Sequence, residues 1–96
     1  MLPAEYVLQS NYPNPFNPST TIRYGVPVRS HVRIAVFTML GEEVNLLSQE
    51  SVDAGYHEVR WSAPVASGVY LYRLEAVSAA DRSFRFARVG KMLLLH

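Results

Sequence analysis

The sequence contains no cysteine among its 96 residues, which excludes disulfide scaffolds and thiolate metal sites. It also lacks any apolar run approaching the ~20 residues that a membrane-spanning helix needs. An excess of charge is missing too, because nine basic and eight acidic residues give a formal net charge of +1. Neither nucleic acid nor a membrane surface is therefore expected as a partner. Stability must come from packing in a single domain, which is all that a chain of this length accommodates.

The most distinctive stretch comprises residues 11–24, where a proline-rich loop changes abruptly into a β-type run. Each proline fixes its own φ angle and disfavours the α region for the preceding residue, so a stiff, extended loop is expected. Tyr12 and Phe16 are expected to turn inward and cover one end of the core. The β-branched and aromatic residues at positions 20–24 predict a strand, which Gly25 and Pro27 are expected to end.

Alternating apolar and polar residues predict a series of short β-strands joined by turns. The clearest pattern places Val32, Ile34 and Val36 on one face of a half-buried strand. Residues 38–41 are expected to form a hairpin turn in which Gly41 has a positive φ angle.

The middle of the chain continues this pattern. Residues 42–47 are expected to return as the partner strand of the hairpin, and the polar residues 48–55 to form a turn. The next strand alternates again and contains Trp61, the only tryptophan of the chain. This large ring is expected to anchor the core.

The last third of the chain predicts two or three further strands. Gly68 closes a crossover loop, and Tyr70 and Tyr72 then share one face of a strand. Gly90 is expected to separate the following strand from a last one at residues 91–96. Seven or eight short strands without a helical period indicate an all-β sandwich rather than a βαβ fold.

Residues able to perform chemistry do not converge in this pattern. His31, His57 and His96 fall on three different predicted strands, without the spacing of a metal site. His57 is expected to be a hydrogen-bonded residue at the boundary of the core rather than a catalytic base. No nucleophile elbow or convergent carboxylate pair is present, so neither enzymatic activity nor a cofactor is expected.

Aromatic residues make up 11% of the chain and raise the possibility of carbohydrate binding. Sugars need an exposed platform of aromatic rings. Most of the rings fall on predicted core faces, which leaves Phe37 and Tyr56 as outward candidates. Two scattered rings make a poor platform.

The proline-rich stretch at residues 12–24 resembles the opening signature of the type A C-terminal sorting domain of type IX secretion. Such domains stand at the ends of secreted and surface proteins of Bacteroidetes-like bacteria. Three later parts of the chain fit the same family, in order: residues 36–44, residues 55–61 with 67–74, and residues 91–96. The resemblance therefore extends over nearly the whole chain.

This resemblance implies an immunoglobulin-like β-sandwich of about seven antiparallel strands and a non-catalytic function. The domain would direct a cargo protein from the periplasm through the type IX outer-membrane translocon to the cell surface or the medium. A sortase-like peptidase would cut it from the cargo. Residues 1–5 would then be the linker from the preceding cargo domain, and residues 6–96 the sorting domain.

Two groups of residues carry the implied roles. The last six residues are the candidates for the sorting signal: Lys91, Met92, Leu93, Leu94, Leu95 and His96. Residues of the family motifs are expected to be structural: Tyr12, Pro13, Asn14, Pro15, Phe16, Asn17, Pro18, Gly41, Trp61, Gly68, Tyr70 and Tyr72. The terminal strand is expected to pack Met92 and Leu94 on the core and to present its other edge or face to the translocon by β-augmentation.

Two alternatives share the sandwich fold. One is an adhesion or carbohydrate-binding module appended to a secreted enzyme. The other is the immunoglobulin-like domain of a flagellar hook cap, which such sequences also resemble. A position at the end of a longer secreted chain favours sorting, whereas an internal position favours the alternatives.

Overall fold

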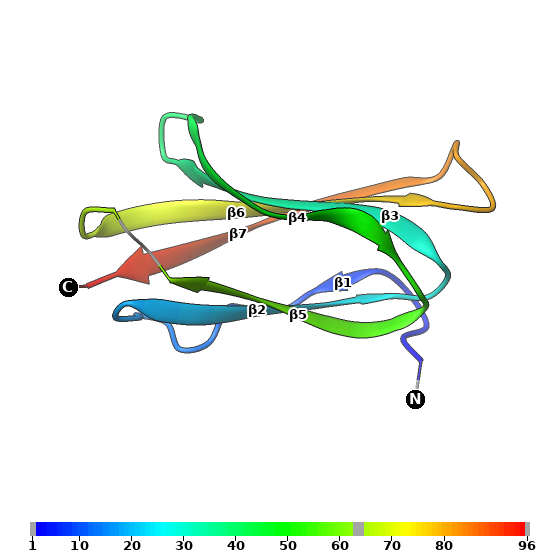
Figure 1. Cartoon of the computed structure of the whole chain (residues 1–96), viewed down its shortest axis with the longest axis horizontal. Coiled ribbons are helices and arrows are strands. Elements are labelled where there is room, and N and C mark those ends of the chain that lie inside the picture. Colours follow the sequence, from blue (N-terminus) through cyan, green and yellow to red (C-terminus); the bar gives the residue numbers. More distant parts are fainter. Residues whose placement is uncertain (1, 63–64, 96) are drawn as a thin grey trace.

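A computed structural model of the chain shows two antiparallel β-sheets stacked face to face (Figure 1). The structure describes residues 2–62 and 65–95. One sheet has three strands in the order β1 (Val7–Leu8), β2 (Ser19–Val26), β5 (Gly55–Ser62). The other has four strands in the order β4 (Glu43–Val52), β3 (Ser30–Thr38), β6 (Gly68–Ser78), β7 (Arg85–Leu94). The predicted sandwich of seven antiparallel strands is confirmed.

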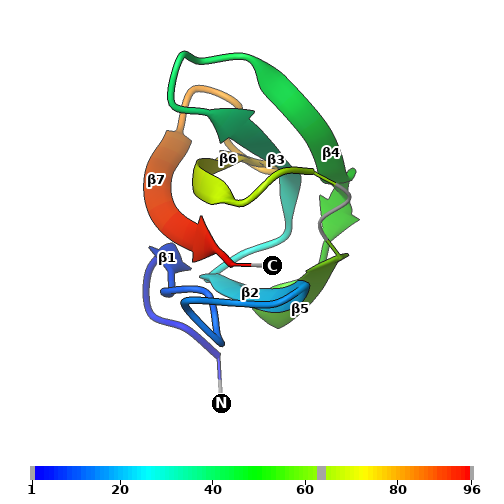
Figure 2. The same cartoon turned by 90° about the vertical axis from the view of Figure 1, so that its left-hand side faces the viewer.

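The end-on view shows how the two layers are arranged (Figure 2). β1 and β7 lie on one side of the sandwich, and β4 and β5 lie on the other. Within the described residues, no helix is long and apolar enough to span a membrane.

The inner faces of the sheets form the core as the alternation predicts. Val32, Ile34 and Val36 of β3 are completely buried, and Trp61 of β5 is 3% exposed. The Trp61 ring makes an edge contact with Tyr70, with ring centroids 5.8 Å apart. The other buried inward residues of β2, β6 and β7 are Thr20, Ile22, Tyr24, Val26, Tyr72, Leu74, Ala76, Ser78, Met92 and Leu94.

The predicted boundaries of two strands are wrong. β4 continues to Val52, through residues that were expected to form a turn, because it pairs with β3 as far as Ser30. β4 is an edge strand, so its polar side chains remain in solvent while its backbone is paired. β2 ends at Val26, directly before Pro27 as predicted, but Gly25 lies inside the strand, where a Cβ atom would come within 3.0 Å of Tyr56 and Val7. The missing side chain makes room for these neighbours.

The predicted break at Gly90 is also wrong, because β7 passes through this residue without interruption. The ring of Tyr72 lies directly over Gly90, and a Cβ atom there would be 2.1 Å from Tyr72 Cζ. Gly90 therefore permits a close approach of an aromatic ring to the backbone.

Tyr72 connects the four-stranded sheet to the segment between β1 and β2. Its hydroxyl donates to the Gln9 carbonyl oxygen and accepts from the Asn11 amide, each over 3.1 Å. Burial raises the pKa of the Tyr72 phenol above the ordinary tyrosine value of about 10, and the hydrogen bond from Asn11 partly offsets this rise. The phenol therefore stays protonated in the folded chain and holds the N-terminal segment in place.

The first testable prediction concerns the contact between Gly90 and Tyr72. Gly90→Ala should lower the free energy of unfolding by about 1–3 kcal/mol, because the new methyl group overlaps the ring. The same change in a Tyr72→Leu background should have a much smaller effect, since Leu lacks the overlapping atoms. Denaturant unfolding of the unmodified domain, the two single variants and the double variant measures the coupling between positions 72 and 90. Additive effects within about 0.5 kcal/mol would contradict the proposed overlap.

A second prediction concerns alkaline pH. The folded chain holds the Tyr72 proton more tightly than the unfolded chain, so above about pH 10 the folded state binds more protons. The free energy of unfolding should therefore fall as the pH rises through this range. Tyr72→Phe should make the fall shallower in denaturant titrations at pH 9 to 11, whereas Tyr12→Phe, at an exposed ring, should not. Equal effects of both substitutions would rule out Tyr72 as the source.

Candidate functional site

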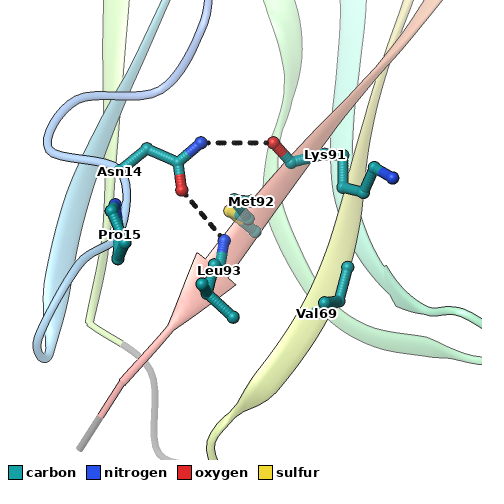
Figure 3. Close-up of a pocket in the computed structure, with 6 residues that line it drawn as sticks. All are labelled: Asn14, Pro15, Val69, Lys91, Met92 and Leu93. Carbon is teal, nitrogen blue, oxygen red and sulfur yellow. Dashed lines mark hydrogen bonds between the residues drawn. The ribbon is translucent and has the colours of Figure 1, made fainter.

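The proline-rich loop lies along the C-terminal half of β7 and pairs with it (Figure 3). The Phe16 amide donates to the Leu93 carbonyl oxygen, and the Leu95 amide donates to the Phe16 carbonyl oxygen, both over 3.0 Å. Phe16 and Leu94 thereby form a parallel β-bridge. A loop that joins two strands of the three-stranded sheet thus pairs with the edge of the four-stranded sheet.

Asn14 extends this pairing through its side chain (Figure 3). Its Oδ1 accepts from the Leu93 amide over 3.0 Å, and its Nδ2 donates to the Lys91 carbonyl oxygen over 3.5 Å. One side-chain amide therefore replaces the peptide group that a neighbouring strand would offer. Asn14 and Phe16 together bond the Lys91 carbonyl, both backbone groups of Leu93 and the Leu95 amide.

Buried hydrogen bonds hold the loop in its shape. Asn11 Nδ2 donates to Thr20 Oγ1 over 3.0 Å and to the Pro13 carbonyl oxygen over 3.2 Å. Thr20 Oγ1 in turn donates to the same carbonyl over 2.9 Å. The peptide bonds before Pro13, Pro15 and Pro18 are cis. The start of the loop is therefore attached to β2 while its middle is attached to β7.

The two aromatic residues of the loop behave differently. Phe16 is 2% exposed and packs against Trp61 with ring centroids 5.8 Å apart, as predicted. Tyr12 is 79% exposed, so the prediction that it turns inward is wrong. The backbone of Tyr12 exchanges two hydrogen bonds of 2.9 Å with Thr21, and this pairing directs its ring toward solvent.

The candidate sorting residues fall into three environments. Met92 and Leu94 are buried in the core, as predicted. Lys91 and Leu95 are exposed, and Leu93 is half-buried. His96 lies outside the described residues. The edge that was expected to face a partner is occupied by the loop at Lys91, Leu93 and Leu95, so only the outer face remains directly accessible there.

A shallow hollow of about 340 Å³ lies where the loop meets β7 (Figure 3). Pro15, Val69 and Leu93 give it an apolar wall, and Lys91 places a cation at its border. Such a surface can receive an apolar side chain next to an anionic group.

The motif residues outside the loop have structural positions. Gly41 has a φ angle of +92° in the turn after β3, as predicted, and Gly68 begins β6 with a φ angle of +156°. The Tyr70 hydroxyl donates to the Ala66 carbonyl oxygen over 2.6 Å. These residues shape the sandwich and do not converge on the hollow.

Residues with possible catalytic chemistry do not form a cluster. His57 stacks on Tyr24 and donates from Nε2 to the Asp53 carbonyl oxygen over 2.8 Å, as expected for a residue at the core boundary. Within residues 2–62 and 65–95, no three His, Cys, Asp or Glu side chains come close enough to hold a metal ion.

The exposed aromatic rings do not form a platform for sugars. The Arg23 guanidinium covers the ring of Tyr56 at 4.7 Å from its centroid. Phe84, which is 46% exposed, stacks on Tyr6. Sequence reasoning did not identify Tyr12 and Phe84 as exposed rings, because their orientation depends on the residues with which they pair or stack, Thr21 and Tyr6.

Sequence reasoning also missed the bonding role of Asn14. An Asn-Pro pair indicates a turn. The side-chain amide of Asn14 can bond like the backbone of a neighbouring strand only because β7 lies next to it. The Lys91 and Leu93 groups that it binds are 77 and 79 residues away in the chain.

Comparisons with known proteins match the chain to one family and to several solved structures. The sequence model described as "Secretion system C-terminal sorting domain" matches residues 10–83, which include the loop and end before β7. The structure is similar to part of dimeric latent PorU from Porphyromonas gingivalis, with a TM-score of 0.66, 21% identity and coverage of 97% of this chain. The chain spans only 10% of that PorU chain.

The second structure is CopC from Methylosinus trichosporium OB3b, with a TM-score of 0.55 and 14% identity. The similarity covers 94% of this chain and 93% of CopC. At these identities both structures support the sandwich fold alone. The search of curated proteins found no match.

A third prediction tests the bond between Asn14 and β7. Asn14→Leu should lower the free energy of unfolding by about 1 kcal/mol and speed hydrogen exchange of the Leu93 amide, which loses its acceptor. Asn14→Asp keeps an acceptor and should largely preserve the protection of Leu93. Asn17→Leu, the same change at an exposed position of the same loop, is the matched control. Unchanged Leu93 exchange in Asn14→Leu would contradict the assigned bond.

Proposed function

The chain belongs to the family of secretion system C-terminal sorting domains, and from this membership we propose that it directs a cargo protein through the type IX outer-membrane translocon. Its function as a sorting domain implies export to the cell surface or the medium. The cargo would precede the domain in the parent chain and would pass through the periplasm before export.

The family match over residues 10–83 is the observation that carries this proposal. It includes the proline-rich loop and strands β2 to β6. The loop binds the C-terminal half of β7, so the matched part of the chain also fixes the position of the candidate signal residues. Recognition would then involve a composite surface in which the loop and the outer face of β7 lie together.

The shape of the domain fits a tag that is held at one end and carries cargo at the other. It measures 41 × 27 × 16 Å, and the two chain ends lie near opposite ends of its long axis (Figure 1). A partner bound at the C-terminal end of β7 would therefore leave room for a folded cargo domain. Leu2, Ala4 and Glu5 are exposed and Pro3 is buried, so a sortase-like peptidase would reach the proposed linker at the exposed positions.

The role requires binding and not chemistry. A sorting domain acts by differential recognition, so the scattered positions of the histidines and carboxylates do not conflict with it. The partners proposed here are the translocon, the peptidase and the cargo domain.

A fourth prediction tests export directly. A periplasmic reporter fused before this domain should reach the surface or medium of a type IX-competent host and stay in the periplasm of the same host without its translocon. Deleting residues 91–96 is a poor test, because it removes buried Met92 and Leu94. Lys91→Ala should reduce export while changing stability by no more than about 0.5 kcal/mol, because Lys91 is exposed.

Arg60→Ala, at an exposed position of β5, is the matched control and should leave export unchanged. Retention of the intact fusion in both hosts, with the domain folded, would refute the proposed function. Normal export of Lys91→Ala would instead remove only Lys91 from the signal.

A further inference from the structure

β7 has a second half whose outer backbone edge pairs with no strand within the described residues. β7 is the last strand of the four-stranded sheet (Figure 2), in which it pairs with β6. The loop bonds to its residues 91, 93 and 95. Since β1 pairs with β2, it does not extend this sheet.

The direction of the free peptide groups follows from the register. The Leu93 amide and carbonyl point away from β6, toward the loop. Peptide groups alternate along a strand, and the pairing of β6 with β7 continues without a shift from Leu94 back to Arg85. The amide and carbonyl groups of Arg85, Ala87 and Val89 therefore point to the same outer side. Within the described residues, no hydrogen-bond partner reaches them.

Side chains do not obstruct this edge. Arg85, Ala87, Arg88 and Val89 are exposed, and Phe86 is half-buried. This half of β7 follows the turn that joins β6 to β7, at the end of the strand opposite the proline-rich loop (Figure 1). On its inner side this half packs against the N-terminal segment, because β1 lies next to β7 (Figure 2) and the Tyr6 ring stacks on Phe86 with centroids 5.3 Å apart. An added strand would therefore lie beside that segment and pair with the outward peptide groups of β7.

The edge also carries charge of one sign. Four of the nine basic residues of the chain, Arg82, Arg85, Arg88 and Lys91, lie between positions 82 and 91, without an acidic residue among them. None of the four forms an ion pair within the described residues. The rest of the chain is correspondingly acidic, since the net charge is only +1.

The cations lie on both sides of β7. Arg85 and Lys91 pair with Val77 and Leu71, which project from the outer face of β6. Arg88 lies on the opposite side, with its guanidinium 5.2 Å from the centroid of the Phe86 ring. A strand placed along the edge would therefore meet a cation on either face.

This arrangement selects the kind of partner. Two copies of β7 would bring like charges opposite each other, which disfavours pairing between copies. The edge strand β4 carries Glu43 and Glu50, but its pairing with β3 shifts register twice, so its edge is irregular. An extended acidic segment of another protein would supply both hydrogen-bond partners for the unpaired peptide groups of β7 and negative charges for its cations.

We propose that the free edge of β7 at residues 85–89 binds an extended, acidic polypeptide segment as an additional strand. The backbone of Arg85, Ala87 and Val89 would supply the hydrogen bonds, and the four cations would select acidic sequences. This surface adjoins the hollow beside the loop and shares Lys91 with it. Binding is a property of the purified domain and does not depend on the export function.

The test uses the whole domain and a defined probe. The probe is a ten-residue peptide with blocked ends that alternates glutamate with valine, and its counterpart carries lysine in place of glutamate. Fluorescence titration should show binding of the glutamate peptide only. Backbone amide NMR should place the largest shifts and slowed hydrogen exchange at Arg85, Ala87 and Val89.

Two variants separate the backbone from the charge. Ala87→Pro removes an outward amide that β6 does not use and should weaken binding about tenfold. Arg85→Glu should also weaken binding about tenfold, whereas Arg60→Glu, with the same change in net charge on β5, should have less than about a twofold effect. If Ala87→Pro does not fold, the pair of charge variants decides.

Several results would overturn the proposal. They are absence of binding, equal binding of the lysine peptide, equal weakening by Arg60→Glu, or amide shifts confined to another strand. Sedimentation that reveals a dimer in the absence of peptide, lost in Ala87→Pro, would assign the edge to a second copy of the chain instead.

Discussion

The fold depends on the attachment of the proline-rich loop to the edge of β7. This loop leads from β1 into β2, both in the three-stranded sheet, yet Phe16 and Asn14 bind the margin of the four-stranded sheet. The Tyr72 hydroxyl adds two further bonds between the layers. A sandwich without disulfides is thus connected across one side by hydrogen bonds and by the buried ring of Phe16.

Local patterns predict most of the strands but not their partners. The inward faces of β2, β3, β5 and β6 follow from alternation, because each depends only on the pleat of its own strand. The errors arise where a distant neighbour decides. Position 90 is a glycine inside a strand because the Tyr72 ring lies over it, and β4 is long because it pairs with β3 along its length. Tyr12 points outward because Thr21 pairs with its backbone.

The same distinction applies to the candidate site. The sequence identifies Lys91 and the apolar residues around it, and the burial of Met92 and Leu94 agrees with their alternation. It does not reveal that the loop occupies the edge beside them, since that contact joins positions nearly eighty residues apart. β7 therefore has a covered half, which presents only its outer face, and an open half with a free backbone. A family signature at the start of the chain and a candidate signal at its end become one surface only in the folded domain.

The elongated shape has a mechanical consequence for a domain that is pulled between its two ends. The strands of both sheets run roughly along the long axis, near whose opposite ends the chain termini lie (Figure 1). Hydrogen bonds between antiparallel strands are perpendicular to the strands. Traction between a restrained β7 and a moving N-terminal cargo would load the bonds between β7 and β6, and those of the loop, together in shear rather than singly by peeling. Because many bonds must then fail at once, the tag would remain folded under a force that opens a hairpin pulled from one end.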